Sequence, residues 1–284
     1  MSWDITKIPV VCINLDRKPE RWERLQSQAG FSEFPAGIQR WSAKDAKTID
    51  VNSDKNISLT VRRNIEKRRR RAHEDIGNVG AIGCYYSHLS VAEWFLRQNA
   101  PVVLVLEDDI KMSTGTFRKL KEHVANTPLL QDSSKWDIWN LGAWSWDYTS
   151  IDEYNRKINA FYLNHAYLMT KSGARVLVDN AFPIIIQYDG YMSLLAQLSM
   201  LRLFGSKKYL ITQWGDQKSD TQGDRTCHIC DLPDNWQPSN GGKNTEGFVA
   251  PYSTERRLAP IPTILIAVAL VGGAWTTWRL TRSK

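Results

Sequence analysis

Apolar runs and amphipathic segments alternate along most of the chain. Two uninterrupted runs, IPVVCINL at 8–15 and VVLVL at 102–106, predict buried strands. The segments 18–28 and 116–128 instead place apolar residues three or four positions apart, as helices with one buried face do. Strands that alternate with helices predict an α/β fold with a mostly parallel sheet flanked by helices.

The rest of the pattern extends this alternation. Residues 34–45 are expected to form a turn and a short strand, and 80–99 a glycine-rich turn followed by a helix. Thr170 is expected to cap the helix that follows it. Further strands are expected at 136–142, 160–170 and 207–213, and further helices at 172–181 and 188–200.

The strand at 102–106 runs directly into three carboxylates, Glu107, Asp108 and Asp109. Alternate side chains of an extended segment point the same way, so Glu107 and Asp109 can face one ion while Asp108 faces elsewhere. Mg²⁺ and Mn²⁺ prefer such oxygen ligands together with substrate phosphates. The alternative is an acidic strand end at the surface with no ligand.

Polar residues also follow the other predicted strands, where open α/β sheets bind ligands. Asn14, Asp16 and Arg17 follow the first strand, and Asp45 follows the second. These groups can hold a base, a ribose or a phosphate, or they can be ordinary turn residues. Ser87 and His88 are expected to begin a helix, whose N-terminal amides favour phosphate. A cap or a packing role is the alternative for His88.

Six motif-like segments follow one another along the chain: INLDRKPER, WSAKDAKTI, GAIGCYYSH, VLVLEDD, HAYLMTKSGARVL and QWGDQKSDTQ. In this order they resemble the motifs of glycosyltransferase family 25. That family includes bacterial lipopolysaccharide sugar transferases, animal collagen galactosyltransferases and relatives in large DNA viruses. The resemblance extends from about Ile8 to about Thr221, and it departs from the family at Ala46, at the basic stretch around Arg70 and in the hydrophobic tail.

The resemblance implies a GT-A type fold with a Rossmann-like nucleotide-binding half, here expected over 1–235. It implies transfer of a hexose, galactose or glucose, from a UDP-sugar with inversion, and the acceptor is a glycan, a lipid-linked glycan or a protein. Mn²⁺ or Mg²⁺ would be the cofactor. The late S-D motif places Ser219 and Asp220 with the donor, and Asp108 is expected to hold the donor's ribose or sugar.

An inverting transferase needs one general base for the acceptor hydroxyl. The candidate is Asp189 in IIIQYDGYM, because it follows an apolar run and precedes a helix, where the family also places an acid. A role as helix N-cap is the equally weighted alternative for Asp189.

Trp144 and Trp146 follow another predicted strand. They are expected either to stack on the acceptor or to pack in the core or at its rim.

The net charge of +7 favours anionic partners. The polar region 47–78 contains the basic run Lys67 to Arg71. This run could be a patch that binds nucleic acid or anionic lipid, or it could be part of a solvated, mobile insertion. We favour the solvated insertion and expect no specific nucleic-acid partner, because no aromatic residues interleave with the arginines.

Cys227 and Cys230 form one CxxC, which favours a thiol pair or a local disulfide over a zinc site.

The segment 261–278 carries no charged side chain, and as a helix it would be roughly 27 Å long, close to the hydrocarbon thickness of a bilayer. We therefore expect a linker at 236–260, a single transmembrane anchor at 261–278 and a basic tail at 279–284. No signal peptide is recognised at the N-terminus, so the catalytic domain is expected to be cytosolic.

Two other functional classes fit parts of the sequence. The same acids could serve a magnesium-dependent nucleotide phosphohydrolase without any sugar acceptor. A non-catalytic module could instead bind RNA through the basic insertion, but the acids at 107, 109 and 189 argue against a decayed site.

Overall fold

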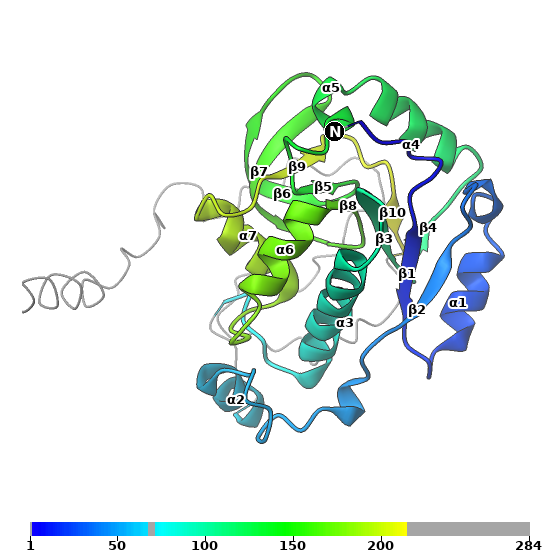
Figure 1. Ribbon diagram of the computed structural model, residues 1–284. Helices are drawn as coiled ribbons and strands as arrows, with labels where there is room; N and C mark the ends of the chain where they lie inside the picture. The colour runs from blue at the N-terminus through cyan, green and yellow to red at the C-terminus, as the bar shows by residue number, and fades with distance from the viewer. Residues whose placement is uncertain (1, 68–71, 215–284) are drawn as a thin grey trace, which may run out of the picture. The chain divides into compact units, whose positions relative to one another are not determined.

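The computed structural model describes residues 2–67 and 72–214 (Figure 1). The chain divides into two units, Met1–Trp236 and Gln237–Lys284, and all described residues belong to the first. Within them, no helix is long and apolar enough to cross a membrane. Several predictions lie outside the described residues: Arg68 to Arg71, Ser219, Asp220, Cys227, Cys230, the linker 236–260, the anchor 261–278 and the tail 279–284.

The centre of the described domain is an eight-stranded sheet. Its strands, in spatial order, are β2 (Gln39–Ser42), β1 (Val10–Asn14), β3 (Val102–Glu107), β8 (Ala166–Thr170), β5 (Ile138–Asn140), β9 (Leu203–Ser206), β7 (Asn155–Tyr162) and β6 (Trp144–Ser150). A second sheet pairs β4 (Ile110–Lys111) with β10 (Thr212–Gln213).

The expected α/β sheet flanked by helices is present, and its strands are parallel in part: the large sheet is mixed. Pairs β1–β2, β1–β3 and β5–β9 are parallel, whereas β3–β8, β5–β8, β7–β9 and β6–β7 are antiparallel. Hydrophobic periodicity indicates a strand but carries no information about its direction. Strands β6 and β7 are joined by a short turn, and only antiparallel neighbours can be connected in this way.

Helices cover both faces of the sheet (Figure 1). Along β3, Val103 and Val105 pack into one core and Leu104 and Leu106 into the other, as the alternation of a strand requires. The first core also contains side chains of α2 (Leu59–Glu66), α3 (Val79–Leu96), α6 (Lys171–Asp179) and α7 (Tyr188–Gln197). The second contains side chains of α1 (Pro19–Gln26), α4 (Thr116–Ala125) and α5 (Pro128–Gln131).

Most predicted elements are present, with differences where segments are short. Thr170 caps α6 as expected, because its hydroxyl accepts a hydrogen bond from the Gly173 amide. The late strand expected at 207–213 shrinks to β10, while β9 was not predicted. Strand β9 has four residues, LFGS, and a run this short has too little alternation to be recognised.

The region 47–78 is a folded part of the domain where it is described, not merely a solvated insertion. Ile57, Val61 and Ile76 are buried in the core that α3 lines. The Arg62 guanidinium donates hydrogen bonds to three backbone carbonyls of the preceding loop. These contacts went unpredicted because few apolar residues are scattered among many polar ones, without a clear period.

Helix α3 starts earlier than expected. It begins at Val79, with the Asn78 side chain accepting a hydrogen bond from the Ala81 amide, so the expected glycine-rich turn is its first part. Gly83 has a packing role: a Cβ at this position would lie 2.7 Å from the Lys44 carbonyl oxygen. The missing side chain lets the loop that follows β2 approach the helix.

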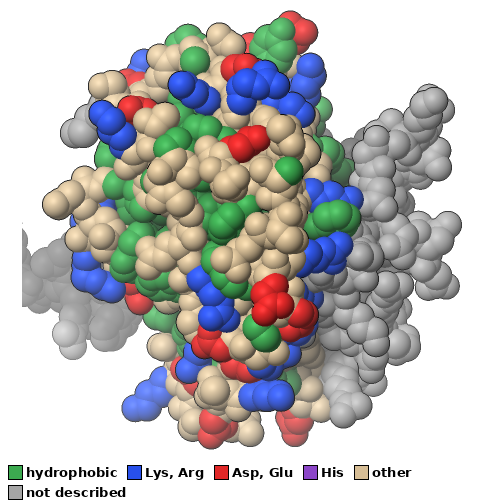
Figure 2. Space-filling view, turned by 90° about the vertical axis from the view of Figure 1, so that its right-hand side faces the viewer, with side chains coloured by type: hydrophobic (Ala, Val, Ile, Leu, Met, Phe, Trp, Pro, Cys, Tyr) green, Lys and Arg blue, Asp and Glu red, His purple; other side chains and the backbone are tan. Residues whose placement is uncertain are grey.

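One face of the molecule is shown in Figure 2. Apolar and uncharged side chains fill much of its middle, and positive and negative side chains are mixed around them. The positive net charge is therefore not gathered into one basic patch on this face.

The role of Gly83 can be tested by Gly83→Ala. In an open helix this change stabilises by roughly 1 kcal/mol, because alanine has the higher helix propensity. Here the new Cβ would press on backbone, so we expect a loss of about 1–3 kcal/mol in the free energy of unfolding, measured by urea denaturation. Wild-type or greater stability would contradict the close approach.

Candidate active site

The parallel strands β1, β2 and β3 end at the same edge of the sheet, and Asn14 connects these ends. Its buried amide nitrogen donates to an Asp108 carboxylate oxygen at 2.7 Å and to the Lys18 carbonyl at 3.1 Å. Its amide oxygen accepts from Arg40 Nε at 2.7 Å. Asn14 thereby fixes the loop after β1 against β2 and the acidic end of β3.

The other polar residues expected after β1 and β2 also come together. Asp16 pairs with Arg40 at 2.9 Å and accepts a hydrogen bond from the Ser42 hydroxyl. Arg17 Nε donates to Asp45 at 2.9 Å, while Asp45 caps the short 3₁₀ helix η2 (Ala46–Thr48). The edge therefore carries a network of charged and hydrogen-bonding groups that joins two loops.

Asp108 is buried and held by Asn14 and Arg21. Its carboxylate accepts from Asn14 and pairs with Arg21 Nη1 at 3.2 Å. Burial and the neighbouring charge of Glu107 raise the pKa of Asp108, while the bonds from Asn14 and Arg21 oppose that rise. Asp108 is thus the member of the acidic cluster with an arginine partner.

Glu107 lies against α3. His88 Nε2 is 3.1 Å from a Glu107 carboxylate oxygen, and His88 Nδ1 is 3.0 Å from the Tyr167 hydroxyl. The His88 ring also stacks on Tyr188, with centroids 4.8 Å apart. Burial raises the pKa of Glu107, but the His88 hydrogen bond and the charges of His88, His165 and Arg21 outweigh it and hold that pKa below its usual value.

Ser87 and His88 do not begin a helix, which corrects the expectation of an amide site for phosphate. Both lie in the middle of α3. The Ser87 hydroxyl donates to the Gly83 carbonyl at 2.6 Å and accepts from the Lys44 amide at 2.8 Å. Ser87 therefore fixes the loop after β2, and His88 reaches the site from the side of the helix.

Asp109 is the least compensated acid of the cluster. Within the described chain, its carboxylate is hydrogen-bonded by the neutral amide of Gln213, at 3.2 and 3.3 Å. Burial and the charges of Glu107 and Asp108 raise the pKa of Asp109 to about 8. Adjacent half-buried acids that repel each other in this way fit a hard divalent cation, which would take the place of the Asp109 proton and balance both charges.

Cys84 brings a second possible donor to the same place. Ligand atoms of Cys84, His88 and Glu107 lie within 4.8 Å of one another, a set that would suit a softer metal. Burial raises the pKa of the Cys84 thiol well above its usual value, and the charges of Glu107, Asp189 and Asp109 add to it. A thiol that resists ionisation is a poor ligand, so the carboxylates are the better metal site.

Asp189 is the second residue of α7, not its N-cap, which is Gln187. Its carboxylate accepts a hydrogen bond from the Gly190 amide at 2.8 Å. Burial and the charges of Glu74 and Glu107 raise the pKa of Asp189 to about 7, although the Gly190 amide lowers it. A half-buried carboxylate with this pKa is suited to take up a proton near neutral pH.

The family model described as glycosyltransferase family 25 (LPS biosynthesis protein) matches residues 7–192. The chain belongs to glycosyltransferase family 25. The match contains Asn14, the three acids after β3 and Asp189.

Relatives carry the same family name. A glycosyltransferase 25 family member of Anopheles gambiae is 27% identical over 66% of this chain and 31% of its own length. One from Drosophila melanogaster is 29% identical over 47% of this chain and 20% of its own length. A mouse protein named inactive glycosyltransferase 25 family member 3 is 27% identical over 47% of this chain and 21% of its own. The chain thus spans less than a third of these relatives.

The structure adds residues that sequence analysis missed. Arg21 ends the INLDRKPER segment of the family 25 resemblance, so the motif itself was a signal. Cys84 likewise belongs to GAIGCYYSH. Gln213 opens QWGDQKSDTQ, so it too lies in one of these segments, whereas Glu74 had no such signal because it approaches the site from a polar region outside them.

The uncompensated charge predicts a pH-dependent cost in stability. The folded chain keeps the Asp109 proton up to a pH of about 8, whereas the unfolded chain loses it near pH 4, so stability falls as pH rises through this window. We expect Asp109→Asn to raise the Tm at pH 8.5 by roughly 2–6 °C without metal. Mn²⁺ should raise the Tm of the wild type and not that of the variant.

Scanning calorimetry between pH 5 and 9 provides the measurement. Glu122→Gln, an exposed acid on α4, is the matched control and should follow the wild type. If Mn²⁺ raised the Tm of the wild type and of Asp109→Asn equally, Asp109 would not be a metal ligand.

Proposed function

We propose that this family 25 domain is a metal-dependent, inverting glycosyltransferase that moves a hexose from a UDP-sugar to a hydroxyl group. One observation carries the proposal: two acidic centres lie close enough for their charges to interact. Burial and the charges of Glu107 and Asp108 raise the pKa of Asp109 to about 8, and the charge of Glu107 also contributes to the pKa of about 7 at Asp189. The first suits a metal and diphosphate, and the second suits a base.

The donor would lie over the ends of β1, β2 and β3. Asn14, Asp16, Arg17 and Asp45 provide donors and acceptors for the base and ribose, and Asp108 for the ribose or sugar. Ser219 and Asp220 belong to the proposed donor site on sequence grounds alone. Arg17, Arg21 and Arg40 surround this edge and favour the negative diphosphate.

Glu107 and Asp109 would hold Mn²⁺ or Mg²⁺. Such an ion neutralises the negative charge of the UDP leaving group. His88 orients Glu107 from the other side, and Gln213 orients Asp109. Arg21 keeps Asp108 apart from both.

Asp189 would take the proton of the acceptor hydroxyl. The hydroxyl oxygen then forms the new bond to the anomeric carbon as the bond from that carbon to the UDP oxygen breaks, which inverts the configuration. The Gly190 amide donates to one oxygen of Asp189 and so orients the carboxylate. Glu74 and Glu107 raise the pKa of Asp189, which makes it the stronger base.

We further propose galactose or glucose as the donor sugar and a glycan, a lipid-linked glycan or a protein as the acceptor. The apolar segment 261–278 would anchor the enzyme to a membrane next to such an acceptor. The direct test of this activity is turnover of a UDP-hexose by the purified chain.

Variants separate the metal site from the base. Asp189→Asn should bind UDP and Mn²⁺ with near-native affinity, while transfer falls by roughly 10²-fold or more, the scale expected for loss of a positioned base. Asp109→Asn should weaken Mn²⁺-dependent UDP binding as well as turnover, because an amide is a poorer ligand for a hard cation.

Calorimetric titration of UDP with and without Mn²⁺, run beside transfer kinetics, makes the distinction. Asp108→Asn is the matched neighbour and should weaken metal-dependent binding less than Asp109→Asn. Near-native transfer by Asp189→Asn would reduce Asp189 to a structural residue of α7. Wild-type enzyme that neither hydrolyses nor transfers any UDP-hexose would overturn the proposed function.

Glu74 allows a test of the base through pH. Replacing Glu74 with glutamine removes a negative charge that raises the pKa of Asp189, so that pKa should fall. The acidic limb of the pH profile of kcat/KM should then move to lower pH by roughly 0.5–1 unit. Glu93→Gln, an exposed acid on α3, should leave the limb in place. An unmoved limb in Glu74→Gln would argue against Asp189 as the titrating base.

A further inference from the structure

We propose that Trp144, Trp146 and Tyr162 form a stacking platform for the acceptor, and that the acceptor is therefore a sugar. This inference rests on the proposed function, since it assigns the acceptor side of the same site. The three rings come from the β6–β7 hairpin at the edge of the large sheet. They are called the aromatic platform below.

The rings of the aromatic platform pack against one another. Trp146 and Tyr162 have centroids 4.1 Å apart with their planes tilted by 33°, and Trp144 is stacked on Tyr162 at 5.9 Å. The centroids of Trp144 and Trp146 are 5.6 Å apart. These contacts hold Trp146, the exposed ring, in place, so that it loses little conformational entropy on binding.

The local backbone gives Trp146 an unusual position. Residue 145 pairs with 161, residue 147 with 160 and residue 148 with 158, so the register of the two strands shifts at Trp146 and shifts back directly after it. Such local irregularities can redirect a side chain and occur often beside active sites. Trp146 has an exposed fraction of 39%, large for a tryptophan in a strand. The hairpin therefore presents an indole to solvent where core packing would have hidden it.

The aromatic platform connects to the candidate base through Glu74. The Tyr162 hydroxyl donates to a Glu74 carboxylate oxygen at 2.5 Å. Glu74 in turn lies beside the start of α7: its Cβ would be 3.1 Å from a Cβ at position 190, and its charge raises the pKa of Asp189. A pyranose on Trp146 would therefore lie near Glu74, which contacts the neighbouring Tyr162.

The chemistry of this surface favours a sugar over a peptide. One face of a hexopyranose carries several C–H bonds and no hydroxyl oxygen, so it can lie flat on an indole, while its edge hydroxyls need hydrogen-bond acceptors. Glu74, whose carboxylate accepts from Tyr162, supplies such an acceptor beside the rings. An extended peptide would instead need unpaired backbone donors and acceptors along its length, which stacked rings do not provide.

The test compares acceptors and variants with Mn²⁺ and the UDP-hexose that the wild type turns over. The acceptor probes are methyl β-galactopyranoside, methyl β-glucopyranoside and a hydroxylysine peptide. In Trp146→Ala we expect the KM for a methyl hexoside to rise about tenfold, the scale of one lost stacking contact, while calorimetric UDP affinity stays native. Trp146→Phe should recover most of the loss because it keeps an aromatic face.

Tyr154→Ala is the matched control. Tyr154 lies in the turn of the same hairpin with an exposed fraction of 50%, and it contacts Lys208 rather than the aromatic platform. The KM of Tyr154→Ala for the methyl hexoside should equal that of the wild type. A rise in this KM as large as that in Trp146→Ala would overturn the proposal.

Two other results would overturn the platform while leaving the transferase intact. One is transfer to the peptide alone, with neither methyl hexoside accepted. The other is an unchanged acceptor KM in Trp146→Ala. By contrast, a wild type without any UDP-hexose hydrolysis or transfer would show that the proposed function itself has failed, because hydrolysis needs no acceptor.

Discussion

The repulsion among consecutive carboxylates at the end of β3 is the constraint on which the site depends. A buried strand places Glu107, Asp108 and Asp109 side by side, where low polarity strengthens their interaction. The fold relieves this repulsion unevenly. Asp108 has Arg21, Glu107 has His88, and Asp109 has the neutral amide of Gln213. A cation bound between Glu107 and Asp109 would relieve the repulsion that these partners leave.

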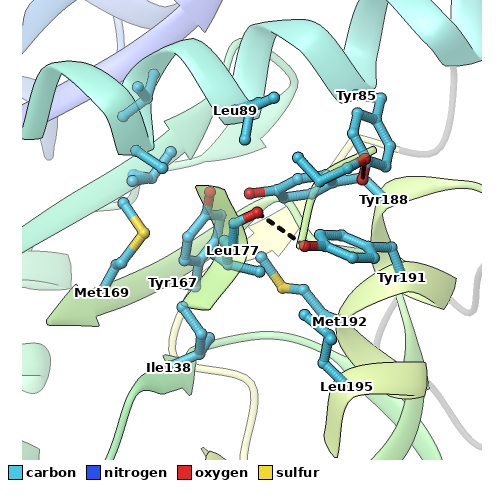
Figure 3. Close-up of a cluster of buried hydrophobic side chains, with 14 of the residues drawn as sticks. Tyr85, Leu89, Ile138, Tyr167, Met169, Leu177, Tyr188, Tyr191, Met192 and Leu195 are labelled. Carbon is cyan, nitrogen blue, oxygen red and sulfur yellow. Dashed lines mark hydrogen bonds between the residues drawn. The ribbon is translucent and has the colours of Figure 1, made fainter. Parts of the chain in front are cut away.

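Helix α3 packs beside these acids and contacts Glu107 directly. Its residues Gly83, Ser87 and His88 each act on a different neighbour: the glycine admits the loop after β2, the serine binds that loop, and the histidine holds Glu107. His88 also connects Glu107 to the core through Tyr167 and Tyr188, two rings that lie between α3 and the sheet in Figure 3. Since Tyr188 directly precedes Asp189, the proposed metal site and the proposed base share one packed support.

The other side of the site is built from parts that are distant in sequence. Glu74 lies between Asp189 and Tyr162, so it affects the pKa of the proposed base and meets the rings of the β6–β7 hairpin. It comes from the polar region that sequence patterning assigned to solvent. A carboxylate in such a region is ordinary by composition, and only its neighbours distinguish it.

The sequence by itself determined the strands β1 and β3, the main helices, the acidic strand end and the family resemblance, because these depend on local periodicity and on short contiguous motifs. It also placed an acid at 189. It did not determine strand direction, the start of α3 or the burial of the region 47–78, since these depend on contacts between distant segments. Only the tertiary structure brought Glu74, Gln213 and Arg21 to the acids and set their different pKa values, because burial and neighbouring charge arise only when the chain is folded.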